Sequence, residues 1–223
     1  MIFCDRSGVQ PHGVFEGLCE VFLFSKRATK EKDPMEKLLR DRRLYEFLEQ
    51  VDKDFAWKAK SVGCEHCGAV LHRADFNRKP RGGPSWDTWD RRYSFCCSRD
   101  GCRKRKTPPS VRFLGRKVYV GVVVVLVSAM MHGPSEHRLH RLQRELAIDR
   151  RTLKGWLKWW TEIFVQCPFW KAARGRFARR MAEARMPLEL VEAFGAWQMD
   201  GLVKLMKFLS PMTTPTWTRG LAM

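Results

Sequence analysis

The sequence predicts a mainly α fold with a small β ribbon, in which a helix-turn-helix unit is followed by C-terminal helices. Apolar residues recur at intervals of three and four over several segments of the 223-residue chain, which is typical of amphipathic helices. Residues 61–116 instead carry two close cysteine pairs among glycines and prolines, which disfavour a long helix. Two short amphipathic segments meet at Ala147-Ile148, as in a helix-turn-helix.

The first helix is expected to begin at Pro34, with Asp33 as its N-cap. We predict an amphipathic helix over residues 34–60, either continuous or broken once. Its apolar positions recur at threes and fours and are Met35, Leu38, Leu39, Tyr45, Leu48, Val51 and Phe55. Residues 1–33 show no sustained period, so they are predicted to be a poorly ordered or irregular N-terminal extension.

A ribbon with short strands is expected over residues 61–116. Strand candidates lie at 69–71 and 91–95, on either side of a basic run, 78–84, that contains two prolines and a Gly-Gly pair. This run excludes regular structure and predicts a basic loop. The 29 residues from 68 to 96 suit two hairpins joined by that loop.

Four cysteines in this ribbon have the spacing of a metal site. Cys64 and Cys67 are separated by two residues and followed by a glycine, and Cys97 and Cys102 are separated by four residues. Two such knuckles supply the four thiolates that tetrahedral Zn²⁺ requires. Because four thiolates leave no open coordination position, we predict a structural site in a small β zinc ribbon.

The ligand set has alternatives. Cys96 also precedes Cys102, but the shorter spacing favours Cys97 and makes Cys96 a core-facing strand residue. His66 and His72 are possible substitutes, although each is more often a surface or packed histidine. Buried free thiols are the simplest competing interpretation. Thiols without knuckle spacing are expected to be ordinary cysteines, namely Cys4, Cys19 and Cys167.

The apolar run 118–131 is β-branched, which favours a strand, but its length and its position before two helices favour a buried helix. We predict a helix. The run is interrupted by Gly121 and Ser128 and is too short to span a bilayer. No export signal is evident either, so a cytoplasmic protein is expected.

The helix-turn-helix is predicted from Ser135 to Trp160. Asp149 is placed to cap the second helix, immediately after the turn. The inward positions of the two helices are Leu139, Leu142, Leu146, Leu153, Trp156, Leu157 and Trp160. The competing interpretation is two helices of a larger bundle with solvated charges.

The excess of positive over negative charge in the chain comes from two blocks. Lysine and arginine total 42 against 24 acidic residues, a net charge of +18. Residues 73–117 hold 14 basic and 4 acidic side chains, and residues 137–180 hold 12 and 3. A clustered positive field attracts a polyanion and releases its counterions. An acidic protein or an anionic membrane would respond to the same field, and the adjoining motifs favour nucleic acid.

Double-stranded DNA is therefore the expected partner. In a helix-turn-helix the second helix enters the major groove, where Arg150 and Arg151 could bind guanine O6 and N7. Thr152 and Lys154 could touch phosphates or bases, and the first helix would hold backbone phosphates. The predicted contacts are Arg78, Lys79, Arg81, Arg103, Lys104, Arg105, Lys106, Arg138, Arg144, Arg150, Arg151, Thr152, Lys154 and Lys158.

Two further helical segments are expected at the C-terminal side. Residues 164–185 form a basic, aromatic-containing segment, and Pro187 begins an amphipathic helix to about Leu209. The tail from Ser210 contains prolines and threonines and is predicted to be irregular.

The order of these motifs resembles the N-terminal part of zinc-ribbon insertion-sequence transposases. Residues 60–162 carry the resemblance: two cysteine knuckles, a short segment with Thr107 and Ser110, the apolar run and the helix-turn-helix. It implies that the ribbon and the helix pair bind transposon-end or related DNA.

Those transposases continue into an RNase H-like domain in which three carboxylates hold two Mg²⁺ ions. Here the residues after Trp160 are too few for that fold, and their acids lie on expected amphipathic helices: Glu162, Glu183, Glu189, Glu192 and Asp200. We therefore expect no enzyme but an accessory or regulatory factor of a mobile element, with a recombinase or transposase as its protein partner. The alternatives are a zinc-ribbon adaptor for protein or RNA, and a truncated transposase.

Overall fold

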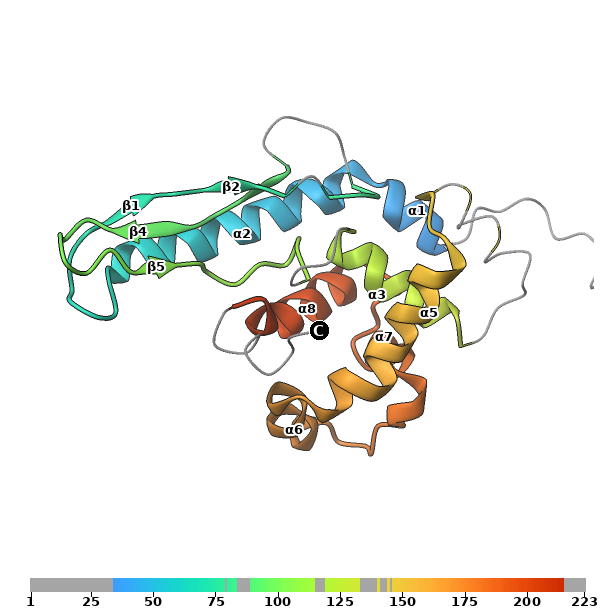
Figure 1. Cartoon of the computed structure of the whole chain (residues 1–223). Helices are drawn as coiled ribbons and strands as arrows, with labels where there is room; N and C mark the ends of the chain where they lie inside the picture. Colours follow the sequence, from blue (N-terminus) through green and yellow to red (C-terminus); the bar gives the residue numbers. More distant parts are fainter. Residues whose placement is uncertain are drawn as a thin grey trace, which may run out of the picture. The chain divides into compact units, whose positions relative to one another are not determined.

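The computed structural model describes residues 34–78, 80–83, 89–114, 119–132, 140, 144 and 146–214 (Figure 1). They all belong to the second of two units, 1–33 and 34–223, so the predicted N-terminal extension lies outside the described residues. Helices dominate, and short strands form two small antiparallel sheets. The predicted mainly α fold with a small β part is confirmed at this level.

The first two helices are α1 (Pro34–Arg40) and α2 (Arg42–Val62). The helix predicted over 34–60 is therefore broken once, at Asp41. This residue is extended, and its Oδ1 accepts a hydrogen bond from Arg43 N at 2.9 Å, which caps α2. Gly63, with φ of 77°, ends α2 in a conformation that favours glycine.

The strands are β1 (Leu71–Arg73), β2 (Phe76–Asn77), β3 (Arg91–Arg92), β4 (Phe95–Cys97) and β5 (Arg105–Lys106). Their order is β1-β4-β5 in one sheet and β2-β3 in the other. Leu71 lies opposite Cys97, and Phe76 lies opposite Arg92. The β1–β4 and β2–β3 pairs therefore have the same register and belong to one hairpin. The expectation of two hairpins joined by a basic loop is wrong, because a single hairpin carries that loop at its tip.

The tip of the hairpin returns to the helical part of the protein. Arg81 O accepts a hydrogen bond from Val120 N at 3.0 Å, and Arg81 forms a bridge with Tyr119. The next element is α3 (Gly121–Met130), in which all ten residues are buried. The β-branched run is thus a helix, as predicted, because helices rather than strands surround it. Among the described residues, no helix combines the length and apolar character needed to span a bilayer.

The C-terminal half contains α5 (Arg150–Lys158), a π-helical turn η1 (Trp159–Ile163), η2 (Phe164–Gln166), α6 (Pro168–Ala173), η3 (Arg174–Arg176), η4 (Glu183–Arg185), α7 (Leu188–Ala193), α8 (Met199–Leu209) and η5 (Ser210–Thr213). The segment 164–185 is not one helix, because extended residues at Cys167 and Phe177 interrupt it. The helix predicted from Pro187 to Leu209 is also two helices, since Gly195 adopts φ of 61° between them.

Two hydrophobic clusters share α2. The larger one joins its N-terminal half, through Leu44 and Leu48, to α3, α5, α7 and α8. The smaller one joins its C-terminal half, through Ala56 and Ala59, to Leu71, Tyr93, Phe95 and Cys97 of the sheet. Because the smaller cluster contains few large side chains, it has little apolar area from which to gain stability.

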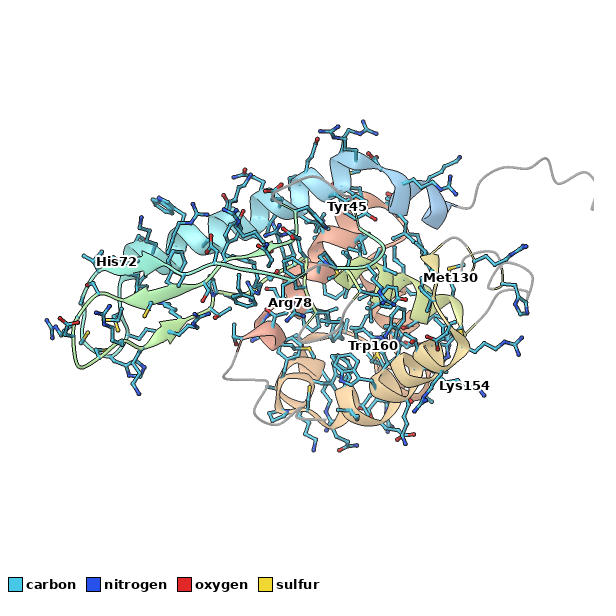
Figure 2. The ribbon with its side chains drawn as sticks, turned by 45° about the horizontal axis from the view of Figure 1, so that its top comes forward. Tyr45, His72, Arg78, Met130, Lys154 and Trp160 are labelled. Atoms are coloured by element: carbon cyan, nitrogen blue, oxygen red, sulfur yellow. The ribbon has the colours of Figure 1, made fainter. Side chains whose placement is uncertain are left out.

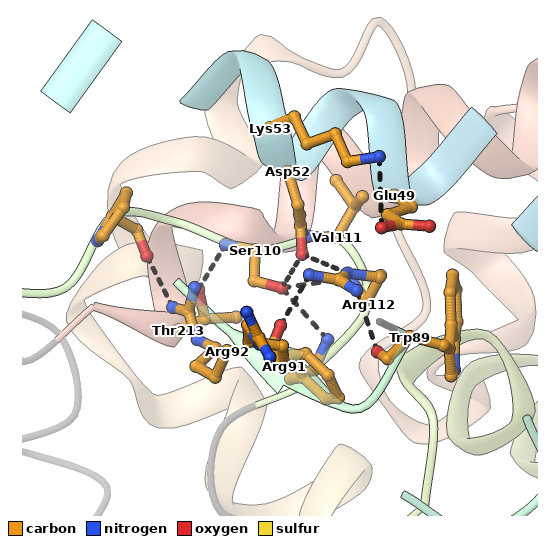
Figure 3. A network of polar contacts seen from close by, with 12 residues as sticks. Glu49, Asp52, Lys53, Trp89, Arg91, Arg92, Ser110, Val111, Arg112 and Thr213 are labelled. Carbon is orange, nitrogen blue, oxygen red and sulfur yellow. Dashed lines mark hydrogen bonds and ion pairs between the residues drawn. The ribbon is translucent and has the colours of Figure 1, made fainter. Parts of the chain in front are cut away.

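A buried ion pair lies between the two clusters (Figure 3). Asp52 of α2 and Arg112 are 1% and 0% exposed, and Asp52 Oδ2 accepts from Arg112 Nε at 2.8 Å. The same carboxylate accepts from Ser110 Oγ at 2.6 Å and from Val111 N at 2.7 Å. Asp52 therefore fixes the segment that leads from the sheet into α3.

Each nitrogen of the Arg112 guanidinium donates a hydrogen bond. Its two terminal nitrogens donate to the carbonyl oxygens of Trp89 and Arg91, each at 2.8 Å, and its carbon lies about 5 Å from the ring centroids of Trp89, Tyr93 and Phe113. The nearby Arg92 is buried as well and donates to Pro108 O, and burial lowers the pKa of Arg92 to about 10. These contacts tie the hairpin to α2.

Asp52→Ala should lower the free energy of unfolding by about 3–5 kcal/mol, because it leaves the Arg112 guanidinium buried without its counter-charge. Urea unfolding of the metal-loaded protein measures the effect. Asp54→Ala is the matched control: this carboxylate is exposed on the same helix and, within the described part of the chain, accepts only from Gln50, so its loss should cost less than about 0.5 kcal/mol. Equal losses for the two variants would contradict the role given to Asp52.

Candidate metal centre and cationic surfaces

The first cysteine pair lies in a tight turn directly after α2. Cys64 N donates to Ala69 O at 2.9 Å, and Gly68 N donates to Cys64 O at 2.8 Å. Gly68 has φ of 71°, which explains the glycine that follows the second cysteine of the pair. The turn directs the side chains of Cys64 and Cys67 toward β4.

The second pair joins β4 to β5. Cys97 is the last residue of β4, and Cys102 N donates to Arg99 O at 3.2 Å in the connecting turn. Two residues of this turn have positive φ, Gly101 at 84° and Arg103 at 43°. Arg103 is a non-glycine residue in the left-handed region, so the turn holds a conformation that costs free energy unless neighbouring contacts offset it.

The four thiols converge. The sulfur atoms of Cys64 and Cys102 are 3.7 Å apart, those of Cys67 and Cys97 are 3.4 Å apart, and all four lie within 4.8 Å of one another. Sulfur ligands about 2.3 Å from a tetrahedral zinc ion would be about 3.8 Å apart, whereas a disulfide would require about 2.05 Å. The cluster can therefore hold a metal ion, and these cysteines are free thiols.

Backbone N–H groups point at the sulfurs. The pKa of Cys64 is lowered to about 7, chiefly by a hydrogen bond from the backbone N–H of His66. Arg99 N donates to Cys97 Sγ at 3.4 Å, but burial still raises the pKa of Cys97 to about 12. A buried thiolate needs a nearby cation. A bound metal ion would supply this charge.

The neighbouring cysteines and histidines stay outside the cluster. Cys96 is half-buried and its Sγ donates to Arg103 O at 3.4 Å, on the sheet face opposite Phe95 and Cys97. The prediction that Cys96 faces the core is wrong, because side chains alternate along β4. His66 and His72 are exposed. Cys167 is buried and accepts from Trp170 N as the cap of α6, and Cys4 and Cys19 lie outside the described residues.

The helix α5 has the predicted cap and a sharply divided surface. Asp149 Oδ1 accepts from Thr152 N at 2.7 Å, which caps α5 as expected. Leu153, Trp156 and Trp160 are buried, and Figure 2 shows Lys154 pointing away from the core into which Trp160 points. At 3.6 residues per turn, the exposed cations fall within about 100° of helix surface. They are Arg150, Arg151, Lys154 and Lys158.

Some of the predicted contacts on α5 have local partners. The Thr152 hydroxyl donates to Asp149 Oδ2 at 2.7 Å, so it would have to leave the cap to donate to a phosphate. Arg150 lies 3.3 Å from His140 Nε2, and Lys158 is 3.8 Å from Glu162. For the side chains of Arg151 and Lys154, the described part of the chain offers no ion-pair or hydrogen-bond partner.

The first helix of the predicted helix-turn-helix is described at His140, Arg144 and Leu146, which are helical. Arg144 is exposed, and Leu146 packs against the larger cluster. The predicted contact Arg138 and the inward positions Leu139 and Leu142 lie outside the described residues. The turn before α5 is formed by Ala147, with φ of 50°, and Ile148, which is buried.

The predicted DNA contacts of the ribbon lie at its two ends. At the tip, Arg78 lies over the Phe113 ring and Arg81 over Tyr119, while Lys79 lies outside the described residues. At the cysteine end, the cations of the segment 103–106 have different surroundings. Arg103 pairs with Asp100 at 2.7 Å, Lys104 is exposed, Arg105 lies over Phe76, and Lys106 pairs with Glu65 at 2.9 Å.

The cysteine cluster and α5 lie at opposite ends of α2. The cluster follows the last residue of α2, whereas α5 packs on α3, which contacts α1 before the first residue of α2. His72 and Lys154, which are far apart in Figure 2, mark the two sites. Because the ribbon directly precedes the helix-turn-helix in the sequence, a metal site beside the second helix of that motif is expected; the structure shows this expectation to be wrong. With 21 residues, α2 separates the two by roughly 30 Å.

The sequence interpretation missed the buried basic residues. Arg92 and Arg112 belong to the basic block 73–117, but they are 4% and 0% exposed and add little to a surface field. Nothing in their sequence neighbourhood distinguishes them from the exposed arginines, because the partners of Arg112 are Asp52, Trp89 and Arg91.

No protein-family model matches the chain, and comparisons with curated proteins and with solved structures give no match either.

Cys64→Ser or Cys102→Ser should release about one metal ion per chain, because three thiolates cannot complete a closed tetrahedral site. Elemental analysis of the purified protein gives the metal content. Cys97→Ser should have the same effect, while Cys96→Ser should keep the metal, since its sulfur is outside the cluster. The metal site would be contradicted if the wild-type protein were purified without metal and had the same free energy of unfolding with and without added metal.

Proposed function

We propose that the chain is a zinc-dependent protein that binds double-stranded DNA, as an accessory or regulatory factor of a mobile element. The observation that carries this proposal is the cationic face of α5. Arg150, Arg151, Lys154 and Lys158 are exposed on a helix whose opposite side is fixed in the larger cluster. A rigid helix that presents exposed cations fits the charge and groove of a DNA duplex.

Zinc is the metal we propose for the cysteine cluster. Four thiolates at tetrahedral separations favour Zn²⁺ over hard cations such as Mg²⁺ or Ca²⁺, which prefer oxygen ligands. Cys64, Cys67, Cys97 and Cys102 would hold the ion with no open position, so its role is structural. It would cross-link the end of α2 to β4 and β5, where the smaller cluster has few large apolar side chains.

The mode of binding follows from α5. Arg150 and Arg151 are in its first turn, the part of a recognition helix that meets base edges. Arg151 and Lys154 have no competing partner in the described residues, so binding DNA would not cost them an existing ion pair. Contacts from Arg144 and from the ribbon would go to phosphates and set the register of the protein on the duplex.

A binding role is favoured over catalysis by the surroundings of the acidic residues after Trp160. Glu189 is 1% exposed and is held by Arg179 at 2.7 Å and by Arg185 at 2.8 Å. Glu183 accepts from Trp170 Nε1 at 2.9 Å. These carboxylates fasten α6, η4, α7 and the segment between η3 and η4 together. We infer a structural function for them, and assign any strand-transfer chemistry to a separate recombinase or transposase.

Arg151→Ala with Lys154→Ala should weaken binding of a DNA duplex by at least tenfold, because Arg151 loses a base contact and Lys154 a phosphate contact, and should reduce the salt dependence of log Kd by about 0.9, the contribution of one phosphate contact. Fluorescence polarisation at several salt concentrations measures both quantities. Lys204→Ala, which removes an exposed lysine of α8, is the control for the loss of charge. It should change the Kd and its salt dependence little.

Two outcomes would count against the proposal. One is that the wild type does not bind the DNA duplex at low salt, or binds it with an affinity that does not depend on ionic strength. The other is equal binding of duplex RNA, whose deep and narrow major groove does not admit a helix; that result would favour the RNA-binding alternative.

A further inference from the structure

A groove of about 500 Å³ lies beside the cysteine cluster, between α2 and β5. We call it the α2–β5 groove and define it by Lys58, Val62, His66, Lys104, Lys106 and Thr107. Its volume lies in the range of small-ligand sites and suits one or two nucleotides rather than a folded partner. The sequence predicted nucleic-acid contacts at Lys104 and Lys106 but not at Lys58, which lies on α2 outside the basic blocks.

The charge of the groove is positive on both walls. Lys58 lies on the α2 wall and Lys104 on the β5 wall, and both are exposed. Within the described residues, neither side chain has an ion-pair partner. The acid at the groove, Glu65, forms an ion pair with Lys106 at 2.9 Å. Two cations therefore remain to bind an anion.

The backbone of β5 forms part of the wall. Both Arg105 and Lys106 line the groove, although their side chains alternate in direction along the strand. The strand is at the edge of its sheet and pairs only with β4. An edge strand has N–H groups without a ladder partner. The Thr107 hydroxyl is next to the strand, and it can donate to a ligand while it accepts from Ser94 Oγ at 3.3 Å. Such donors match the acceptor oxygens of phosphodiesters, which proteins bind through lysines, hydroxyls and backbone N–H groups.

We propose that the α2–β5 groove binds the phosphodiester backbone of one nucleic-acid strand. This extends the proposed DNA-binding function by giving the protein a second contact, separated from α5 by the length of α2. The groove would accept an unpaired strand, and α5 requires a duplex. The protein would thus bind DNA that offers both, such as a duplex with a single-stranded extension.

The test uses the full-length, zinc-loaded protein and two labelled probes: a single strand of about 8 nucleotides and a duplex of about 25 base pairs. The groove variant is Lys58→Ala with Lys104→Ala. Its matched control is Lys60→Ala, an exposed lysine on the same helix that does not line the groove. Metal content and circular dichroism verify that each variant is folded.

The groove variant should bind the single strand at least tenfold more weakly, with a salt slope reduced by about 1.4, since each phosphate contact to a single strand contributes about 0.7. Lys60→Ala should bind it like the wild type. The α5 variant Arg151→Ala with Lys154→Ala should keep single-strand binding and lose affinity for the duplex.

Three results would overturn the assignment of the groove. Single-strand binding that is absent in the wild type, or unchanged in the groove variant, removes the site while leaving duplex binding by α5 intact. Competition by polyglutamate as effective as that of an oligonucleotide of equal charge would instead identify an acidic protein segment as the ligand. If the groove variant behaves as expected but duplex binding is insensitive to α5, the function proposed for α5 fails and the groove remains.

Discussion

The ion pair between Asp52 and Arg112 holds the two halves of the described structure together. Asp52 lies in the middle of α2, between the helix positions that pack into the larger cluster and those that pack on the sheet. Arg112 connects it to the hairpin through the carbonyl oxygens of Trp89 and Arg91. Burying two charges is unfavourable unless every polar atom is satisfied, and here the carboxylate and the guanidinium meet that condition. The pair therefore stabilises one arrangement of α2, the hairpin and the segment before α3, because other arrangements would leave a buried charge unpaired.

This arrangement makes α2 a spacer between two surfaces with different chemistry. At its C-terminal end, the cysteine cluster lies beside the α2–β5 groove, where Lys58 and Lys104 have no competing anion among the described residues. Beyond its N-terminal end, α3 supports α5 and its exposed cations. Each surface is positive, but one is a groove and the other a convex helix. In our proposal a single protein can thus hold nucleic acid at two places without any change of its own shape.

The metal and the ion pair act on different parts of the sheet. The smaller cluster relies on Leu71, Tyr93 and Phe95, which pack on two alanines of α2, so its apolar burial is modest. A bound metal would fasten the β4–β5 end, including the strained turn at Arg103, whereas Arg112 fastens the other end of the hairpin. Between them, Asp75 Oδ1 accepts from Ser94 N at 3.0 Å and bridges the interruption between the two ladders. A hairpin with little core of its own is thereby held at three points along its length.

Local patterns in the sequence were sufficient for the features that depend on near neighbours. The two-residue spacing of Cys64 and Cys67, the Asp149 cap and the apolar stripe of α5 are each encoded within one or two turns of chain, and each is present in the structure. The partner of Cys102, the break between α7 and α8 and the placement of the basic loop at the tip of one hairpin required long-range contacts to resolve. So did the pairing of Asp52 with Arg112, which are 60 residues apart. Helical periodicity and cysteine spacing are properties of a short segment, whereas a buried ion pair, a strand register and the distance between two sites exist only after distant segments have packed. The chain by itself determined the Cys64–Cys67 pair and the cationic helix, and only tertiary packing decided that Cys97 rather than Cys96 joins the cluster and that α2 keeps the cluster and α5 apart.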